Sequence, residues 1–495
     1  MIAGAFTHTI NNLRANAFPV IAMIPTWRLY SHLPNAKAEP RSNTHLPLRY
    51  LMTEKTGASL NGVERLYLDF DSFFASAEQH FNASLRGRPL GVVPLDSPHT
   101  SCIAVSREAK ARGVRSGSSI ADARKIIPDM IFVVARHDVY VRLHKRILNV
   151  IDTIVPVEKV RSIDEVVCHL LPNEAQQGSA LSDRLKAALA ENFSATLSCS
   201  IGMAPTELLA KIGAEMNKPD GFCLISKGSI PEQLASIELD DIPGISKGMR
   251  VRLAAADVDD FASLWSLAPK QARAIWGSVE GERFWNELHG YHSQRPATKK
   301  GMFGHSRMLP RDWRTPDKVE ACARQLTLSA ARRLRREGFR ATRITFALRG
   351  GTGSKTSNWS WEGAFPAARD DHSFLKSLAE GFAKARRQVN FSVFSVSIMI
   401  HGLEGEGQST GDLFGGIIDP QSGMESAAAR EKREKLSDLL DEMRKKHGSK
   451  AVSYGHQEEI PGGFVGAKIA FGRIPDEEDF GGSSGPDEAT QFLSY

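Results

Sequence analysis

Two acidic clusters in the chain have the residue types and the setting that a divalent cation requires. In LYLDFDSFF an apolar run ends at Asp69-Phe70-Asp71, and in VRSIDEVVCHL Asp164 and Glu165 interrupt two apolar runs. Magnesium prefers hard oxygen ligands and shares its coordination between protein carboxylates and substrate phosphates. Neighbouring strand residues point to opposite faces, so Asp164 and Glu165 can reach one metal only at a bend or a hairpin tip.

Each cluster alone has an ordinary structural explanation. Asp69 and Asp71 could solvate a strand end and start a helix, and Asp164-Glu165 could form a solvated hairpin turn. A buried group of three or four carboxylates, by contrast, repels itself and is tolerated mainly when cations neutralise it. The presence of both clusters in one chain therefore favours a metal site.

A lysine in a third segment could bind phosphate. The sequence CSIGMAPTELLAKIGAEMNKPDG predicts a helix that begins near Pro205, carries Lys211 and ends at Asn217-Lys218-Pro219. Lys211 could be a point charge for a polyphosphate. Taken alone, it is more often a solvated helix lysine, since lysine is mostly exposed.

The elements around these residues predict an α+β or α/β core from Val63 to about Gly221. β-branched and aromatic runs predict strands, and apolar periodicity predicts amphipathic helices. The expected elements are strands at 63–70, 130–135 and 194–204 and helices at 143–155 and 206–216.

Further regions follow along the chain. Short helices around DDIPGISKGMRVRL predict a helical module at 223–292, followed by a basic linker at 294–300. The next hundred residues predict a compact β-α-β-α-β domain. Its expected elements are strands at 304–309, 343–350 and 391–400 and helices at 316–338 and 371–389.

The C-terminal region predicts a flexible, Gly-rich connector after Leu403, a helix near 425–447 and an acidic tail that we expect to be disordered. The helix has an apolar stripe formed by Leu436, Leu439, Leu440 and Met443.

Composition narrows the class of protein. The chain has 495 residues, and no apolar run approaches the roughly 20 residues of a membrane span. The net charge of +6 favours a polyanionic partner. Five scattered cysteines without a Cys-x-x-Cys pair suggest neither a zinc site nor a disulfide framework, so we expect a reducing cytoplasm. Residues 1–62 predict an unstructured extension, with a targeting segment or a start at Met52 as alternatives.

The three chemical segments together resemble the Y-family DNA polymerases, the impB/mucB/samB-type group that contains bacterial DNA polymerases IV and V. The resemblance covers roughly residues 63–403 and rests on D-x-D-x-FF-A-x-x-E, S-x-D-E and SIG-A-P…LAK…NKP-x-G. It implies an α+β, multidomain right-hand polymerase. The implied parts are a palm (63–71 and 135–222), fingers (72–134), a thumb with a helix-hairpin-helix (223–292), a little finger (300–404) and a linker, helix and tail (405–495).

The resemblance also assigns roles at the active centre. Asp69, Asp164 and Glu165, with the backbone carbonyl of Phe70, would hold two Mg²⁺ ions. The nucleotide-binding residues would be Phe73 and Phe74, through their backbone amides, and Lys211; Phe74 would also be the steric gate that rejects a 2′-hydroxyl by clash.

The fingers depart from the family pattern. Where relatives carry a Tyr and an Arg that grip the triphosphate, IAVSREAKARGV offers Arg107 and Lys110. Charge is preserved, but ring and guanidinium geometry are not. Val167 also replaces an aromatic residue. Nucleotide affinity and lesion preference are therefore open, whereas the reaction type is not.

Several residues are expected to bind DNA or a partner protein. Ile242-Pro243-Gly244-Ile245 resembles a helix-hairpin-helix turn, with a plain helix-helix turn as the alternative. The expected DNA-binding residues are Gly244, Ile245, Lys247, Arg332, Arg333, Arg336 and Arg343, in a run that also contains Arg335 and Arg340. A weak sliding-clamp-binding peptide is expected at Gln408, Leu413 and Phe414.

The resemblance implies a template-dependent, low-fidelity translesion polymerase that uses primer-template DNA and deoxynucleoside triphosphates, and we expect a monomer. A non-catalytic DNA- and clamp-binding adaptor is the main alternative, and retention of Asp69, Asp164 and Glu165 argues against it. A structural helix-hairpin-helix DNA-binding protein would leave the acidic clusters unexplained.

Overall fold

A computed structural model describes residues 62–94, 100–352, 355–405, 427–447, 451–452 and 474. All of them belong to the compact unit Thr56–Tyr495. The predicted extension before Gly62, the clamp-binding peptide at 408–414 and almost all of the acidic tail lie outside the described residues.

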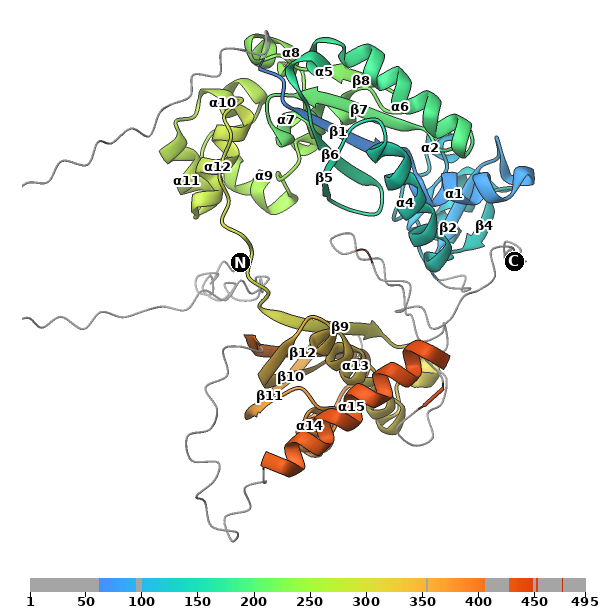
Figure 1. Cartoon of the computed structure of the whole chain (residues 1–495), viewed down its shortest axis with the longest axis vertical. Coiled ribbons are helices and arrows are strands. Elements are labelled where there is room, and N and C mark those ends of the chain that lie inside the picture. Colours follow the sequence, from blue (N-terminus) through green and yellow to red (C-terminus); the bar gives the residue numbers. More distant parts are fainter. Residues whose placement is uncertain are drawn as a thin grey trace, which may run out of the picture. The chain divides into compact units, whose positions relative to one another are not determined.

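A five-stranded sheet holds both acidic clusters (Figure 1), with the strand order β5-β6-β1-β7-β8. The central strand β1 pairs antiparallel with β6 on one side and β7 on the other. The strands are β1 (Arg65–Phe70), β5 (Val157–Val160), β6 (Glu165–His169), β7 (Cys199–Ala204) and β8 (Phe222–Leu224). The predicted strand at 194–204 was too long, because residues 194–197 form a turn closed by Leu197 N–H donating to Ser194 O.

Alternation along β1 sends its side chains into two different cores. Leu66, Leu68 and Phe70 pack with helices α4 and α6, whereas Tyr67 packs with α7. Asp69 follows Tyr67 by two residues and therefore lies on the α7 face of the sheet. The helices of this region are α4 (His137–Asp152), α5 (Pro172–Gln176), α6 (Gly178–Asn192) and α7 (Glu207–Met216).

A second, three-stranded sheet, ordered β3-β2-β4, supports the residues after the first acidic cluster. Its strands are β2 (Leu90–Val93), β3 (Ala104–Val105) and β4 (Ile131–Val134). The accompanying helices are α1 (Phe73–Phe81), η1 (Ala83–Leu85), α2 (Arg107–Ala111) and α3 (Ile120–Ile126).

The predicted helical module is confirmed. Its core is continuous with the α7 side of the five-stranded sheet, since Ile242, Met249 and Phe284 pack in the same cluster as Tyr67 and Leu209. The elements are η2 (Lys227–Ser229), α8 (Ile230–Leu234), η3 (Leu239–Asp241), α9 (Lys247–Ala254), α10 (Phe261–Ser266), α11 (Pro269–Trp276) and α12 (Val279–Leu288).

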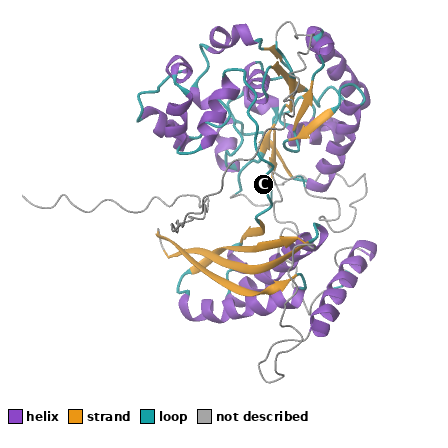
Figure 2. Cartoon of the chain, turned by 60° about the vertical axis from the view of Figure 1, so that its left-hand side comes forward, coloured by secondary structure: helices purple, strands orange, loops and turns teal. Residues whose placement is uncertain are grey.

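The C-terminal body has one strand more than predicted. Its sheet is ordered β11-β10-β12-β9, and the unpredicted strand is β11 at its edge. Figure 2 shows the helices of this body against one face of the sheet. The elements are β9 (Met302–Met308), η4 (Arg311–Trp313), α13 (Pro316–Arg336), β10 (Phe339–Thr352), β11 (Lys355–Ala368), α14 (Asp371–Gln388) and β12 (Ser392–Gly405). Ile344 and Phe346 of β10 face the helices, whereas Arg343 and Arg349 are exposed.

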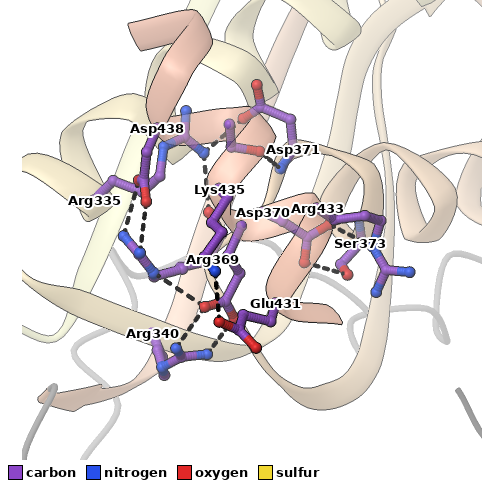
Figure 3. Close-up of polar contacts among 12 residues, drawn as sticks. Arg335, Arg340, Arg369, Asp370, Asp371, Ser373, Glu431, Arg433, Lys435 and Asp438 are labelled. Carbon is purple, nitrogen blue, oxygen red and sulfur yellow. Dashed lines mark hydrogen bonds and ion pairs between the residues drawn. The ribbon is translucent and has the colours of Figure 1, made fainter. Parts of the chain in front are cut away.

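The predicted C-terminal helix is α15 (Ala427–His447), and it binds this body through its polar face (Figure 3). Glu434 is 7% exposed and accepts hydrogen bonds from Arg340 and Arg369. Asp441 accepts a bond from Arg335 at 2.7 Å. The apolar stripe faces away, with Leu436 50% and Leu439 52% exposed.

These contacts correct the expected role of the arginine run. Arg335 has a side chain 3% exposed, pairs with Asp371 at 2.7 Å and also binds α15. Arg340 binds Glu434, and Arg333 donates to Gly304 O at 2.7 Å. The run is therefore not one DNA-facing surface, because much of it holds the C-terminal body together.

We predict that Glu434→Gln loosens α15 and that Glu431→Gln does not. Glu434 is a buried acceptor for two arginines, and weakening those bonds costs about 1–3 kcal/mol. Glu431 forms an exposed pair with Lys435, a type of pair that contributes little. Hydrogen exchange of the α15 amides measures both, and equal protection in the two variants would show that the ion pairs do not hold the helix.

Candidate active site

Strand register brings the two acidic clusters together. Asp69 of β1 lies directly opposite Glu165 of β6 in the antiparallel ladder. Asp164 lies in a bend at 162–164 just before β6 begins, and its carbonyl accepts a bond from Phe70 N–H at 2.9 Å. The bend that the sequence required for Asp164 and Glu165 to share a site is therefore present.

Burial of carboxylates dominates the electrostatics of this site. The pKa of Asp69 is raised to about 7, chiefly by burial; Lys218 opposes this shift, and the charges of Glu215 and Asp164 add to it. Burial also raises the pKa of Asp164. Burial acts the same way on Glu165, but Lys211 holds its pKa below the usual value. Negative charge packed this closely calls for cations.

Two lysines face these carboxylates. Lys218 Nζ lies 2.8 Å from Asp69 Oδ1 and 2.9 Å from Glu215 Oε1. Lys211 pairs with Glu165 and lies over the Tyr67 ring at 5.3 Å. The sequence predicted a phosphate contact for Lys211, whereas Lys218 was predicted only to mark the end of the helix. Its position directly before Pro219, two residues after the helix that carries Lys211, was the signal available.

The donor set fits a hard divalent cation that is completed by its substrate. Three carboxylates and the Phe70 carbonyl are the oxygen donors that magnesium prefers, and phosphates commonly supply its remaining ligands. Among the residues that the structure describes, no three carboxylates, imidazoles or thiols are arranged closely enough to hold a metal by themselves.

Asp71, the remaining acid of the first cluster, has a structural role. Its carboxylate accepts bonds from Ser198 Oγ at 2.8 Å, Ser200 Oγ at 3.0 Å and Asp220 N–H at 2.8 Å. Asp71 thus ties β1 to the strand β7 and to the loop that carries Lys218. Sequence alone could not separate its role from that of Asp69.

The aromatic pair after the first cluster begins helix α1. Phe73 is 2% exposed and Phe74 is 6% exposed, so both rings are largely core. Their backbone N–H groups belong to the first turn of the helix, where donors have no intrahelical partner. Phe74 stacks on Tyr140 with ring centroids 4.8 Å apart.

Arg107 and Lys110, the two basic residues expected to bind the triphosphate, approach the same region. Arg107 Nη1 donates to Ser198 Oγ at 3.1 Å, next to Asp71. Burial and the nearby Lys218 lower the pKa of Lys110, while Asp71 and Asp69 oppose that shift. Val167, the residue that replaces an aromatic side chain, is fully buried on the α7 face of the sheet.

The turn before α9 is the one that the sequence predicts to contact a DNA phosphate. Gly244 has φ +97°, which only glycine adopts without strain, and Lys247 is exposed at the first turn of α9. Ile245, also expected to contact DNA, has a side chain 6% exposed, and its N–H donates to Ile242 O at 3.0 Å. Only Gly244 and the start of α9 remain for a phosphate.

Comparison with known proteins shows which family the sequence matches. Residues 68–215 match the impB/mucB/samB family and residues 301–413 match its C-terminal domain. The chain belongs to the impB/mucB/samB family, which comprises Y-family DNA polymerases. DNA polymerase IV of Moorella thermoacetica is 26% identical over 402 residues, spanning 78% of this chain and 94% of that protein. DNA polymerase IV of Saccharolobus solfataricus is 28% identical over 258 residues, spanning 51% and 72%.

A solved structure shows the same fold. The Y-family DNA polymerase chimera Dbh-Dpo4(243-245)-Dbh superimposes with a TM-score of 0.58 at 21% identity, over 69% of this chain and 99% of that one. The expected α+β, multidomain polymerase fold is confirmed. Within the described ranges, every helix is too short or too polar to cross a membrane.

We predict that the two acids of the first cluster differ in their effect on the stability of this Y-family chain. Asp71→Ala leaves three donors without their acceptor and destabilises the sheet by about 2–4 kcal/mol. Burial already disfavours the ionised form of Asp69. Removing this carboxylate in Asp69→Ala should therefore leave the stability of the sheet unchanged. Hydrogen exchange of the β1 and β7 amides tests both. A larger loss for Asp69→Ala would reverse the two roles.

Proposed function

We propose that this Y-family DNA polymerase catalyses low-fidelity, template-directed nucleotidyl transfer past DNA lesions, with two Mg²⁺ ions at Asp69, Asp164 and Glu165. One observation carries the proposal: Asp69 and Glu165 are register partners at the end of a stiff sheet, with Asp164 in the adjoining bend. A site on paired strands holds its groups more rigidly than a loop does, and positioning supplies most of the catalysis of phosphoryl transfer.

The protein groups have distinct tasks in this mechanism. Asp69, Asp164, Glu165 and the Phe70 carbonyl would hold the metal ions, which would supply two things: a lower pKa for the primer 3′-hydroxyl and compensation of charge on the departing pyrophosphate. Asp69 and Glu165 hold opposite sides of the site from neighbouring strands. Lys211 and Lys218, already beside these carboxylates, are placed to exchange them for phosphate oxygens.

Triphosphate binding extends to the fingers residues. Phe73 and Phe74 offer backbone N–H groups at the start of α1, where the helix dipole favours an anion. Lys110 lies within electrostatic reach of Asp69 and Asp71, and Arg107 lies beside Ser198. We assign both to the triphosphate, as charges that replace the family's Tyr and Arg.

We predict that Asp69→Asn and Glu165→Gln each slow nucleotide incorporation by at least about 10²-fold, because a neutral amide is a poor metal ligand. Affinity for primer-template DNA should stay near the wild-type value, because the substitutions change only the metal site. Primer extension and fluorescence anisotropy measure the two quantities. Glu158→Gln on β5 is the matched control, and extension at wild-type rates in Asp69→Asn would end the assignment.

We propose that Phe74 selects deoxynucleotides by clash with a 2′-hydroxyl. Phe74→Ala should lower the preference for deoxynucleotides over ribonucleotides by at least about tenfold, since exclusion needs the ring. Phe73→Leu is the control, because Phe73 is a neighbouring core ring that this proposal gives no contact with the sugar. The test is to measure the kinetics of single-nucleotide incorporation with deoxynucleotides and with ribonucleotides. Unchanged discrimination in Phe74→Ala would mean that another residue is the gate.

DNA binding is proposed at two surfaces. Gly244 and Lys247 would contact a backbone phosphate at the helix-hairpin-helix turn. On the C-terminal body, the sheet face opposite its helices presents Arg343 and, unpredicted by the sequence, Arg349. Of the helical arginines, Arg336 is the exposed one, so we assign Arg332 and Arg333 to packing and not to DNA.

Three further assignments stay proposals. Gln408, Leu413 and Phe414 would bind a sliding clamp. A monomer would act in the cytoplasm, which agrees with all five cysteines being free and buried. The adaptor alternative is not favoured, because it gives no reason for three carboxylates and two lysines to be gathered in one site.

A further inference from the structure

Phe74 is backed by one large aromatic ring from another helix. Tyr140 of α4 stacks on Phe74 with centroids 4.8 Å apart and planes 25° apart, while His137 meets the Phe74 ring edge-on at 6.0 Å. Tyr140 is fully buried. Stacked rings at this separation attract one another beyond the area that they bury, so the position of Tyr140 constrains that of Phe74.

A buried ion pair fixes Tyr140 in turn. Its hydroxyl donates to Glu78 Oε1 at 2.7 Å. Arg136 donates to both oxygens of the same carboxylate, at 2.9 and 2.7 Å. Glu78 is fully buried. Burial and Glu78 raise the pKa of Tyr140 well above its ordinary value, so the hydroxyl stays protonated and donates.

The four residues form a closed arrangement between two helices. Phe74 and Glu78 are one turn apart on α1, and Arg136 and Tyr140 are one turn apart at the start of α4. The ring stack joins the two helices at one level and the hydrogen bonds to Glu78 join them at the next. Sliding or rotation of either helix turn would strain both contacts.

This stiffness bears on sugar selection. A ring excludes a hydroxyl only if it does not yield, because a gate that moves aside leaves room for the extra oxygen. Packed interiors resist such motion through the groups behind the contact. A ring that lost its stacking partner would gain room to retreat.

We propose that Tyr140, held by Glu78 and Arg136, is the positioning residue that keeps Phe74 rigid and thereby sets discrimination between deoxyribose and ribose. The inference rests on the proposed role of Phe74 as the gate. Tyr140 acts through Phe74 and does not contact the sugar itself. The alternative is that Tyr140 is a core tyrosine whose only contribution is to stability.

Four variants of the full chain separate these roles. Tyr140→Leu removes the stack, Tyr140→Phe keeps the stack and removes the bond to Glu78, and Phe74→Ala removes the gate. Ile147→Ala is the matched control, since Ile147 is fully buried two turns further along α4. For each variant, kcat and KM are measured with a deoxynucleotide and its ribonucleotide, together with the melting temperature.

The inference predicts that Tyr140→Leu lowers the sugar discrimination ratio by about tenfold or more, with kcat for the deoxynucleotide within about threefold of wild type. Tyr140→Phe should fall between Tyr140→Leu and wild type. Ile147→Ala should lower the melting temperature and leave the ratio unchanged. In the Phe74→Ala background, Tyr140→Leu should cause no further loss, because it acts only through that ring.

Contrary results are distinguishable. If Phe74→Ala relaxes discrimination but Tyr140→Leu does not, the positioning role is wrong and the gate assignment stands. If Tyr140→Leu and Ile147→Ala change the ratio equally, Tyr140 is a stability residue only. If Phe74→Ala discriminates as wild type does, the gate and the positioning role are both overturned.

Discussion

The burial of neighbouring carboxylates at one end of the five-stranded sheet is the constraint on which the rest of the structure depends. Burial disfavours the ionised form of all three acids. They are held there by β1, by β6 and by the bend between β5 and β6. Two lysines on or just after α7 oppose that charge. The surrounding elements position the two lysines. Helix α7 packs on the Asp69 face of the sheet, and Asp71 anchors the loop that carries Lys218.

The C-terminal body uses charge differently. Its buried carboxylates Asp371 and Glu434 are compensated by arginines of the same body, so these charges need no external cation. Pairing of this kind specifies which helix face docks more than it adds stability. It leaves the apolar stripe of α15 exposed, the reverse of an ordinary amphipathic helix.

The sequence predicted most of the region around the two acidic clusters, because its signals are local. The strand before Asp69, the bend at Asp164 and the helix with Lys211 each follow from a short pattern, and register then brings them together. β11 was missed because its exposed and half-buried residues alternate around Trp359 and Trp361 at a sheet edge, without the continuous apolar run of a central strand. The ion pair of Arg340 was not predicted for another reason. Its partner Glu434 lies more than ninety residues further along the chain, and sequence periodicity carries no information over that distance.

The ladder between β1 and β6 also governs which length changes the chain can accept. Successive strand residues point to opposite faces, so losing or gaining one residue between Arg65 and Asp69 would turn the Asp69 carboxylate toward α4 and α6. The same change would bring the apolar Leu68 or Phe70 to the α7 face beside Lys211. Substitutions along β1 can be absorbed by repacking, whereas a single-residue insertion or deletion there would exchange the contents of the two cores. The spacing of this strand is therefore under a stricter constraint than its composition.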